Sequence, residues 1–278
     1  MCGWVGSLGQ CPDEHNLKLA GDTMLSRGPD GSGERRIPIG PMPAGFAHRR
    51  LAILDTTEAG AQPMHDAERG VTVVYNGEIY NSPQLRRELQ AQGVRFHSTS
   101  DTEVLLLGWA EWGDQILDRI EGIFSFALFD ERRGRALLAR DHLGVKPLYW
   151  AEINGGVVAA SAPRAILALR PELRADLDRV ALAQFLMLLW IPHPRSPWTR
   201  IRKLPRLMLS PSKVAVSANG GTGSPRRKVT ALSIRWPSAR RWSRRPPASC
   251  SVTSLSGCCC RAGSIRQSCS NTWSATTG

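Results

Sequence analysis

Cys2 stands directly after the initiator methionine and is followed by Gly3. A thiol attacks as its thiolate, so a nucleophilic cysteine needs a base that takes the proton. Removal of Met1 would give Cys2 a free α-amino group with an ordinary pKa of about 8, so that one residue carries both nucleophile and base. The alternative is that Cys2 is a small apolar residue at the start of an edge strand.

Four further polar clusters carry groups that suit substrate binding, but each also has an ordinary structural interpretation. "RGPDG" at 27–31 suits a surface turn, and "HRRL" at 48–51 suits a charged strand edge. Asn76-Gly77 is a pair typical of hairpin turns, and Asp101 suits the first turn of a helix. None of these clusters indicates a function by itself.

The elements that must position these residues alternate between strands and helices. Ser82-Pro83 is typical of a helix start, and Ser100 with Glu103 has the spacing of a capping box. Apolar patterning predicts a helix over 13–28, strands over 2–8, 46–54 and 70–81, and hairpins over 123–141 and 147–161. Hairpins with helices set between them predict an α+β fold, in which helices cover antiparallel sheets.

Charge divides the chain near Pro205. Residues 1–205 hold 24 Lys and Arg and 24 Asp and Glu, whereas residues 206–278 hold 12 Lys and Arg and no acid, which accounts for the net charge of +12. The second part also holds five of the seven cysteines. The chain lacks an apolar run of about 18 residues and a secretory signal, so we expect a cytoplasmic protein without a membrane span or disulfides.

Eight motifs in order resemble the glutaminase domain of glutamine-dependent asparagine synthetases. They are Cys2-Gly3, "RGPDG", "HRRLAILD", "AGAQPM", "YNGEIYN", "SDTEVLL", "GIFSFALFD" and "RDHLGVKPLY", and together they cover residues 2–170. "RGPD" and "GVKPLY" favour this branch over the amidotransferases of purine or hexosamine synthesis. The resemblance implies a class II glutamine amidotransferase domain of the N-terminal-nucleophile hydrolase type, a four-layer αββα sandwich with Cys2 on a central strand.

The resemblance also implies a role for each site residue. Cys2 attacks the side-chain amide of L-glutamine and forms a thioester, and ammonia leaves. The oxyanion is bound by the Asn76 side chain and the Gly77 backbone N–H. The substrate's α-carboxylate and ammonium are bound by Arg50, Leu51, Ile53, Glu78 and Asp101, of which Arg50 takes the carboxylate and the two acids the ammonium. This domain needs no metal and no cofactor. Arg49 is structural, and Trp4 stands where the family usually has an aliphatic residue.

The family continues with a synthetase domain that uses ATP and Mg²⁺ to activate L-aspartate for amidation. Residues 171–205 resemble the linker and the start of that domain, through "LAQFLMLLWIPHPRSPWTRIRKLP". If the domain is present, ATP and L-aspartate join L-glutamine as ligands. We expect neither nucleic acid nor membrane as a partner, and a homodimer is possible.

Residues 206–278 are predicted to be a basic, out-of-frame and disordered tail. The S-G-G-x-D-S-S pyrophosphate loop of the family is absent from the protein as written. A shifted reading frame can restore that loop over residues 253–269. If each new triplet joins the third base of one codon to the first two bases of the next, the triplets can encode D-V-P-V-G-L-L-L-S-G-G-L-D-S-S-V-L, which contains the loop. The same shift at 206–209 permits P-A-H-A. A frameshift therefore explains the tail better than a nucleic-acid-binding arm does.

Three alternatives stay open at this point. The chain is an inactive truncated remnant, or a glutaminase with a nucleic-acid-binding tail, or a relative that amidates a different carboxylate. The last would include a carboxylate on a cell-surface sugar or an antibiotic precursor.

Overall fold

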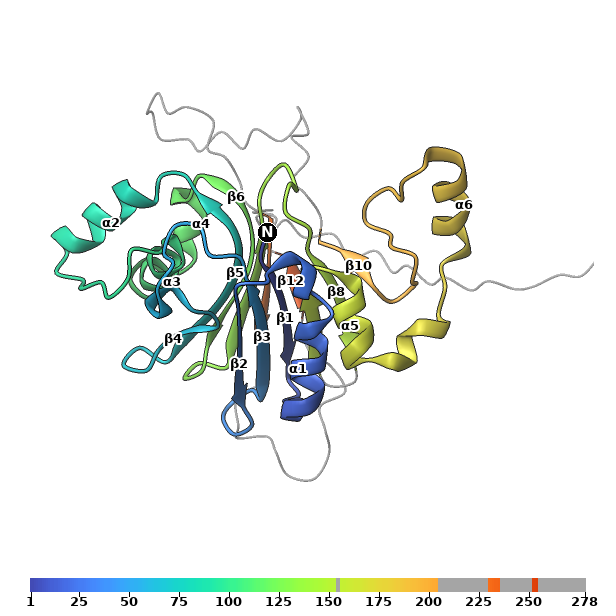
Figure 1. Cartoon of the computed structure of the whole chain (residues 1–278), viewed down its shortest axis with the longest axis horizontal. Helices are drawn as coiled ribbons and strands as arrows, with labels where there is room; N and C mark the ends of the chain where they lie inside the picture. The colour runs from blue at the N-terminus through green and yellow to red at the C-terminus, as the bar shows by residue number, and fades with distance from the viewer. Residues whose placement is uncertain (154–155, 205–229, 236–251, 255–278) are drawn as a thin grey trace, which may run out of the picture.

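Two six-stranded antiparallel sheets form the centre of the molecule (Figure 1). The computed structural model describes residues 1–153, 156–204, 230–235 and 252–254. Sheet A has the order β10 (Arg202–Lys203), β8 (Tyr149–Ile153), β9 (Gly156–Ala160), β1 (Gly3–Leu8), β3 (Ala44–Arg50) and β2 (Gly31–Ile37). Sheet B has the order β12 (Val252–Ser254), β11 (Thr230–Arg235), β7 (Arg135–Arg140), β6 (Gly122–Asp130), β5 (Val71–Ile79) and β4 (Met64–Asp66).

Helices cover the outer face of each sheet. On sheet A lie α1 (Glu14–Asp22) and α5 (Pro163–Leu169), and on sheet B lie α2 (Ser82–Ala91), α3 (Asp101–Trp112) and α4 (Ile116–Arg119). Short 3-10 turns are formed by Leu25–Arg27, Glu58–Gly60, Gly113–Gln115 and Pro171–Ala175. The predicted four-layer αββα sandwich is confirmed.

Strand alternation separates three hydrophobic cores. Along β1, Trp4 and Leu8 belong to the core between the sheets, whereas Val5 packs outward against α1 and α5. Along β5, Val74 faces the other sheet, and Tyr75 faces α3. Successive side chains of a strand point to opposite faces, so this assignment fixes the direction of every other residue on β1 and β5.

Local signals in the sequence place two helix starts correctly. Pro83 occupies the first turn of α2, and Ser100 caps α3 by accepting a hydrogen bond from the Thr102 N–H at 3.1 Å. The second half of the predicted capping box is wrong. The Glu103 carboxylate instead accepts from the backbone N–H groups of His97 and Ser98, both at 2.8 Å, and so fastens the preceding loop.

The alternative interpretation of Asn76-Gly77 as a hairpin turn is wrong, because β5 (Val71–Ile79) runs straight through both residues. Asn76 pairs with Ser125 and Gly77 with Phe124 on β6. A Cβ on Gly77 would lie 2.3 Å from the Ile123 carbonyl oxygen. The glycine is therefore required by the close approach of a neighbouring strand.

Two short segments of 206–278, the region predicted to be disordered, form strands at the edge of sheet B. The backbone of β11 pairs with β7 from Thr230 opposite Arg140 to Arg235 opposite Arg135, and β12 pairs with β11. An edge strand offers unpaired N–H and C=O groups, which an additional strand can satisfy. The rest of 206–278 lies outside the described residues, as does most of the shifted-frame segment.

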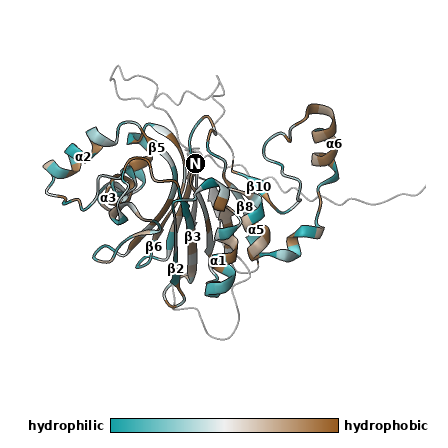
Figure 2. Ribbon diagram, in the orientation of Figure 1, coloured by the Kyte–Doolittle hydropathy of each residue, from teal (hydrophilic) through white to brown (hydrophobic). Residues whose placement is uncertain are grey.

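Helix α6 (Arg179–Leu188) stands apart from the sandwich and exposes apolar side chains (Figures 1 and 2). Asp178 caps its start by accepting from the Ala181 N–H at 3.0 Å. Leu186, Met187 and Leu189 are exposed to 80%, 83% and 81%, and Ala181 is the buried residue of the helix. Such a contiguous apolar surface favours association in water.

We expect Leu186→Glu to reduce self-association of the chain without changing its melting temperature, because the Leu186 side chain is almost fully exposed. Light scattering over a range of protein concentrations measures the association, and circular dichroism measures the melting. Gln90→Glu on α2, an exposed position, is the control with the same change in charge. Equal association of the two variants would contradict this prediction.

Candidate active site

Cys2 lies at one end of the sandwich, immediately before β1. The β1–β3 register pairs Gly3 with Arg49, so its continuation sets Cys2 opposite Arg50. The Leu51 N–H donates to the Cys2 Sγ at 3.3 Å, and the thiol lies 3.6 Å from the Leu51 carbonyl oxygen. In Figure 1 the N-terminus lies at the end of the sheets where β5 leads to α2.

Four of the predicted site residues belong to the inner faces of the sheets. Trp4 and Phe46 lie in the core between the sheets. Cys2 is two residues before Trp4 of β1, and Arg50 is four residues after Phe46 on β3. Asn76 and Glu78 follow Val74 of the same core at intervals of two. The period of two therefore directs the side chains of Cys2, Arg50, Asn76 and Glu78 to the space between sheet A and sheet B.

Asn76 is a buried amide with an unused donor. Its side chain is 2% exposed, and within the described residues its Nδ2 has no hydrogen-bond partner. A buried donor without a partner costs free energy, so such a group in a folded protein calls for an explanation. A ligand oxygen that accepts from Nδ2 would supply one.

Arg50 is held by the loop that follows β3. Its Nη1 donates to the Thr57 carbonyl at 2.7 Å, and its Nη2 donates to the Asp55 carbonyl. Gly60 makes room for this group, since a Cβ there would lie 2.3 Å from Nη2. A guanidinium has five N–H groups, so Arg50 keeps donors for a carboxylate.

Asp101 approaches from behind β5, at the start of α3. Its Oδ2 accepts from the Tyr75 hydroxyl at 2.7 Å and from the Ile79 N–H at 3.0 Å. Burial raises the pKa of the Asp101 carboxyl, against the two hydrogen bonds, which lower it. Burial also raises the pKa of Tyr75 well above its ordinary value, so the phenol stays protonated and donates.

The remaining predicted residues differ in exposure. Glu78 is exposed on β5, and the side chain of Ile53 is 72% exposed in the loop after β3. Leu51 contacts Cys2 through its backbone, as described above. The structure thus brings Cys2, Arg50, Leu51, Asn76, Gly77 and Glu78 to one end of the sandwich, holds Asp101 behind β5, and leaves Ile53 at the surface.

Three residues that hold this arrangement, Arg27, Asp30 and Asp55, were not among the predicted site residues. Arg27 Nε donates to the Cys2 carbonyl at 3.1 Å, and burial lowers the pKa of Arg27. Asp30 accepts from the Ala52 N–H at 2.9 Å, and its own N–H donates to the Arg50 carbonyl at 3.0 Å. "RGPDG" therefore holds both Cys2 and the loop after Arg50, and the interpretation as a plain surface turn is wrong.

Asp55 joins the Arg50 loop to the start of α3. Its carboxylate accepts from the backbone N–H groups of Thr57 and Thr99, both at 2.9 Å, and from their hydroxyls. These bonds, led by the Thr57 hydroxyl, lower the pKa of Asp55. The aspartate was visible in "HRRLAILD", but its partner 44 residues away was not.

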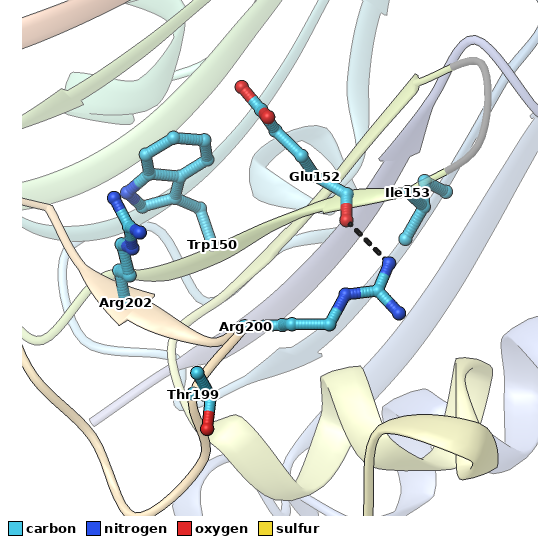
Figure 3. A pocket seen from close by; sticks show the side chains of 6 residues that line it. All are labelled: Trp150, Glu152, Ile153, Thr199, Arg200 and Arg202. Atoms are coloured by element: carbon cyan, nitrogen blue, oxygen red, sulfur yellow. Dashed lines mark hydrogen bonds between the residues drawn. The ribbon is translucent and has the colours of Figure 1, made fainter. Parts of the chain in front are cut away.

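The described residues also contain a cavity of about 460 Å³ between β8 and the segment that leads into β10. Trp150, Glu152, Ile153, Thr199, Arg200 and Arg202 line it, and Arg200 donates to the Glu152 carbonyl at 3.3 Å (Figure 3). None of the predicted site residues lines this cavity. No three His, Cys, Asp or Glu side chains gather as metal ligands in the described part of the chain.

Comparison with known proteins supplies the family. A model of the glutamine amidotransferase domain matches residues 1–221. The chain belongs to the class II glutamine amidotransferases. The amidotransferase domain is homologous to the N-terminal domain of asparagine synthetases. It is 40% identical over 212 residues to asparagine synthetase [glutamine-hydrolyzing] 3 of Bacillus subtilis. The aligned residues are 73% of this chain and 33% of that protein.

A second relative and one solved structure agree with this assignment. Asparagine synthetase B [glutamine-hydrolyzing] of Escherichia coli is 39% identical over 145 residues, which are 52% of this chain and 25% of that protein. The fold matches the glutamine phosphoribosylpyrophosphate amidotransferase of Bacillus subtilis with a TM-score of 0.50 at 20% identity, over 60% of this chain and 43% of that one. The amidotransferase chain thus spans about a third or less of these curated relatives. Within the residues that the structure describes, no helix combines the length and apolar character that a membrane span requires.

Acid is expected to destabilise the folded amidotransferase through His48. Burial lowers the pKa of His48 from 6.5 to about 4, so between these values the unfolded chain binds a proton that the folded chain does not. The free energy of unfolding should therefore fall as pH falls from 6.5 to 4, by about 3 kcal/mol in total from this residue. Urea unfolding of wild type and His48→Gln across this range measures the contribution, and equal pH slopes would exclude it.

Gly77→Ala is expected to destabilise the fold by about 1–3 kcal/mol, because the new Cβ overlaps the Ile123 carbonyl and the Phe124 backbone. Urea unfolding at pH 7 gives the value. Gly31→Ala is the control, since a Cβ there meets Arg50 at an ordinary 3.7 Å. The prediction fails if the two variants have the same midpoint.

Proposed function

We propose that the chain hydrolyses the side-chain amide of L-glutamine to glutamate and ammonia, with Cys2 as the nucleophile. The observation that supports this proposal is the approach of the Cys2 thiol and the unpartnered Asn76 amide from two sheets to the same end of the sandwich. The family agrees with it, as do the names of the relatives, which are called glutamine-hydrolyzing.

Before any catalysis, removal of Met1 frees the α-amino group of Cys2. The free α-amino group of Cys2 takes the thiol proton, and the thiolate attacks the amide carbon. When the C–N bond breaks, the same amine returns the proton to the departing ammonia, and a thioester remains. Water, deprotonated by the amine, then attacks the thioester, the C–S bond breaks, and glutamate leaves with the thiol restored.

Two donors stabilise the oxyanion of both tetrahedral intermediates. These are the Asn76 Nδ2 and the Gly77 backbone N–H, on consecutive residues of β5. Asn76 lies within a strand that pairs with β6 along its whole length, so the donor is held before the substrate binds. Removal of one such donor typically costs about a hundredfold or more in rate.

The amino-acid end of glutamine is recognised by charge. Arg50 binds the α-carboxylate with the N–H groups that its loop leaves free. Glu78 binds the α-ammonium group together with Asp101, which reaches the same end of β5 from α3 through its bond to the Ile79 N–H. Leu51, whose backbone contacts the Cys2 thiol, and Ile53, which is exposed on the loop after β3, would contact the bound substrate from that loop. Neither a metal nor a cofactor takes part in these steps.

In a longer protein the ammonia would serve ATP-dependent amidation of L-aspartate, as the names of the relatives suggest. There the synthetase domain, whose linker and first segment would be residues 171–205, would bind ATP and Mg²⁺. An acceptor carboxylate other than that of aspartate is the alternative. An inactive remnant is the second candidate, and the exposed apolar side chains of α6 favour it.

Cys2→Ala is expected to lower glutaminase activity by about a thousandfold or more, because the nucleophile is removed. Release of glutamate and ammonia from L-glutamine by the purified chain measures it. Cys11→Ala is the matched control, since Cys11 is also a free and partly buried cysteine.

A two-residue extension ahead of an intact Cys2 tests the base. It converts the α-amino group into an amide, which cannot take a proton, and should abolish activity as strongly as Cys2→Ala. Equal activity of wild type and Cys2→Ala would exclude the nucleophile, and full activity of the extended chain would exclude the base. Absence of activity in a folded wild-type chain would favour the remnant.

A further inference from the structure

Two polar side chains of sheet A cross the core and bind the backbone of sheet B. The Trp4 Nε1–H donates to the Ser125 carbonyl at 3.1 Å, and the His48 Nε2 lies 3.1 Å from the Tyr75 carbonyl. A carbonyl oxygen only accepts, so the His48 proton is on Nε2. Trp4 and His48 are 0% and 1% exposed, and they are direct partners in the β1–β3 pair.

Both acceptors are next to Asn76. Tyr75 precedes it on β5, and Ser125 is its partner on β6. At the other end of these bonds, Trp4 is two residues from Cys2, and His48 is two residues from Arg50. The pair of side chains therefore connects the strand of the thiol and the strand of the carboxylate-binding arginine with the strand of the oxyanion donor.

These bonds limit how the two sheets can lie. Apolar packing is not directional, so a core of Leu and Val alone allows small shifts of one sheet over the other. An N–H···O bond between buried groups weakens steeply with distance and angle, and its loss leaves a buried polar group unpaired. The backbone of Trp4 is itself anchored, because its N–H donates to Ser161 Oγ at 3.2 Å and its carbonyl accepts from the Ser161 N–H at 2.9 Å.

We propose that Trp4 and His48 are positioning residues that set the separation of Asn76 from Cys2. The inference rests on the proposed glutamine hydrolysis. The bond depends on the indole N–H, so an aliphatic residue at position 4 would leave the Ser125 carbonyl without this donor. A misplacement of about 1 Å between reacting groups can cost a hundredfold in rate. The Arg50 guanidinium is held by the Thr57 and Asp55 carbonyls of its own loop, so binding of the amino-acid end depends less on Trp4 and His48.

Trp4→Phe tests the inference, since phenylalanine keeps an aromatic ring and loses the N–H. We expect kcat for glutamine hydrolysis to fall by about 10- to 100-fold, with KM changed by less than about threefold. Trp109→Phe is the matched control. Trp109 is 5% exposed in the core between sheet B and its helices, and its Nε1 has no partner within the described residues, so the variant loses a similar volume and no such bond.

A second pair of variants covers the case in which Trp4→Phe does not fold. His48→Gln keeps an amide N–H donor for the Tyr75 carbonyl, and His48→Leu removes it. We expect kcat to fall about tenfold or more further in His48→Leu than in His48→Gln, with KM again little changed.

The outcomes separate this inference from the proposed function. If the wild type shows hydrolysis that depends on Cys2, but Trp4→Phe matches Trp109→Phe or the two His48 variants are equal, the positioning role is wrong and the proposed function stands. A fall of kcat confined to Trp4→Phe and His48→Leu supports the role. A folded wild-type chain without Cys2-dependent hydrolysis overturns both.

Discussion

The face-to-face packing of the two antiparallel sheets is the constraint on which the candidate site depends. Cys2 and Arg50 belong to sheet A, whereas Asn76 and Glu78 belong to sheet B. Because side chains alternate along a strand, the apolar residues that fill the space between the sheets also determine which polar residues face each other at the end of that space. Trp4, Phe46 and Val74 of this core thus fix the directions of Cys2, Arg50 and Asn76. A slip of one residue in any of the three strands would turn its functional side chain toward the helices.

Aspartate side chains fasten the loops around this end of the sandwich. Asp30 binds the backbone on both sides of Leu51, Asp55 joins the Arg50 loop to Thr99, and Asp101 binds Tyr75 and Ile79 on β5. Each of these carboxylates accepts hydrogen bonds from backbone N–H groups, which are strong when the acceptor is charged. The loops that carry the proposed substrate-binding groups are therefore held by bonds within the protein itself. Preorganisation of this kind is what electrostatic stabilisation of an oxyanion requires.

Helix α6 differs from the helices that cover sheet B in how its apolar residues are used. The leucines of α2 and α3 are buried, whereas α6 and the residue that follows it expose Leu186, Met187 and Leu189. The curated relatives are about three times as long as the matched region. The amidotransferase fold thus fills its own cores with residues up to Leu204, which is itself buried, while α6 presents a surface that its own sandwich does not cover.

The sequence by itself determined the family and the αββα architecture, and it supplied the residues proposed for the candidate site. Hairpins, helix starts and motif order depend on periodicity and on contacts within a few residues, so they can be predicted without the fold. The tertiary structure alone decided that Asn76-Gly77 lies inside a straight strand, since the nearness of the Ile123 carbonyl is a contact over 46 residues. It alone also decided that Arg27, Asp30 and Asp55 support the site and that Trp4 reaches Ser125. Such contacts join residues that are 20 to more than 100 positions apart, and only the packing of strands and sheets brings them within the reach of a hydrogen bond.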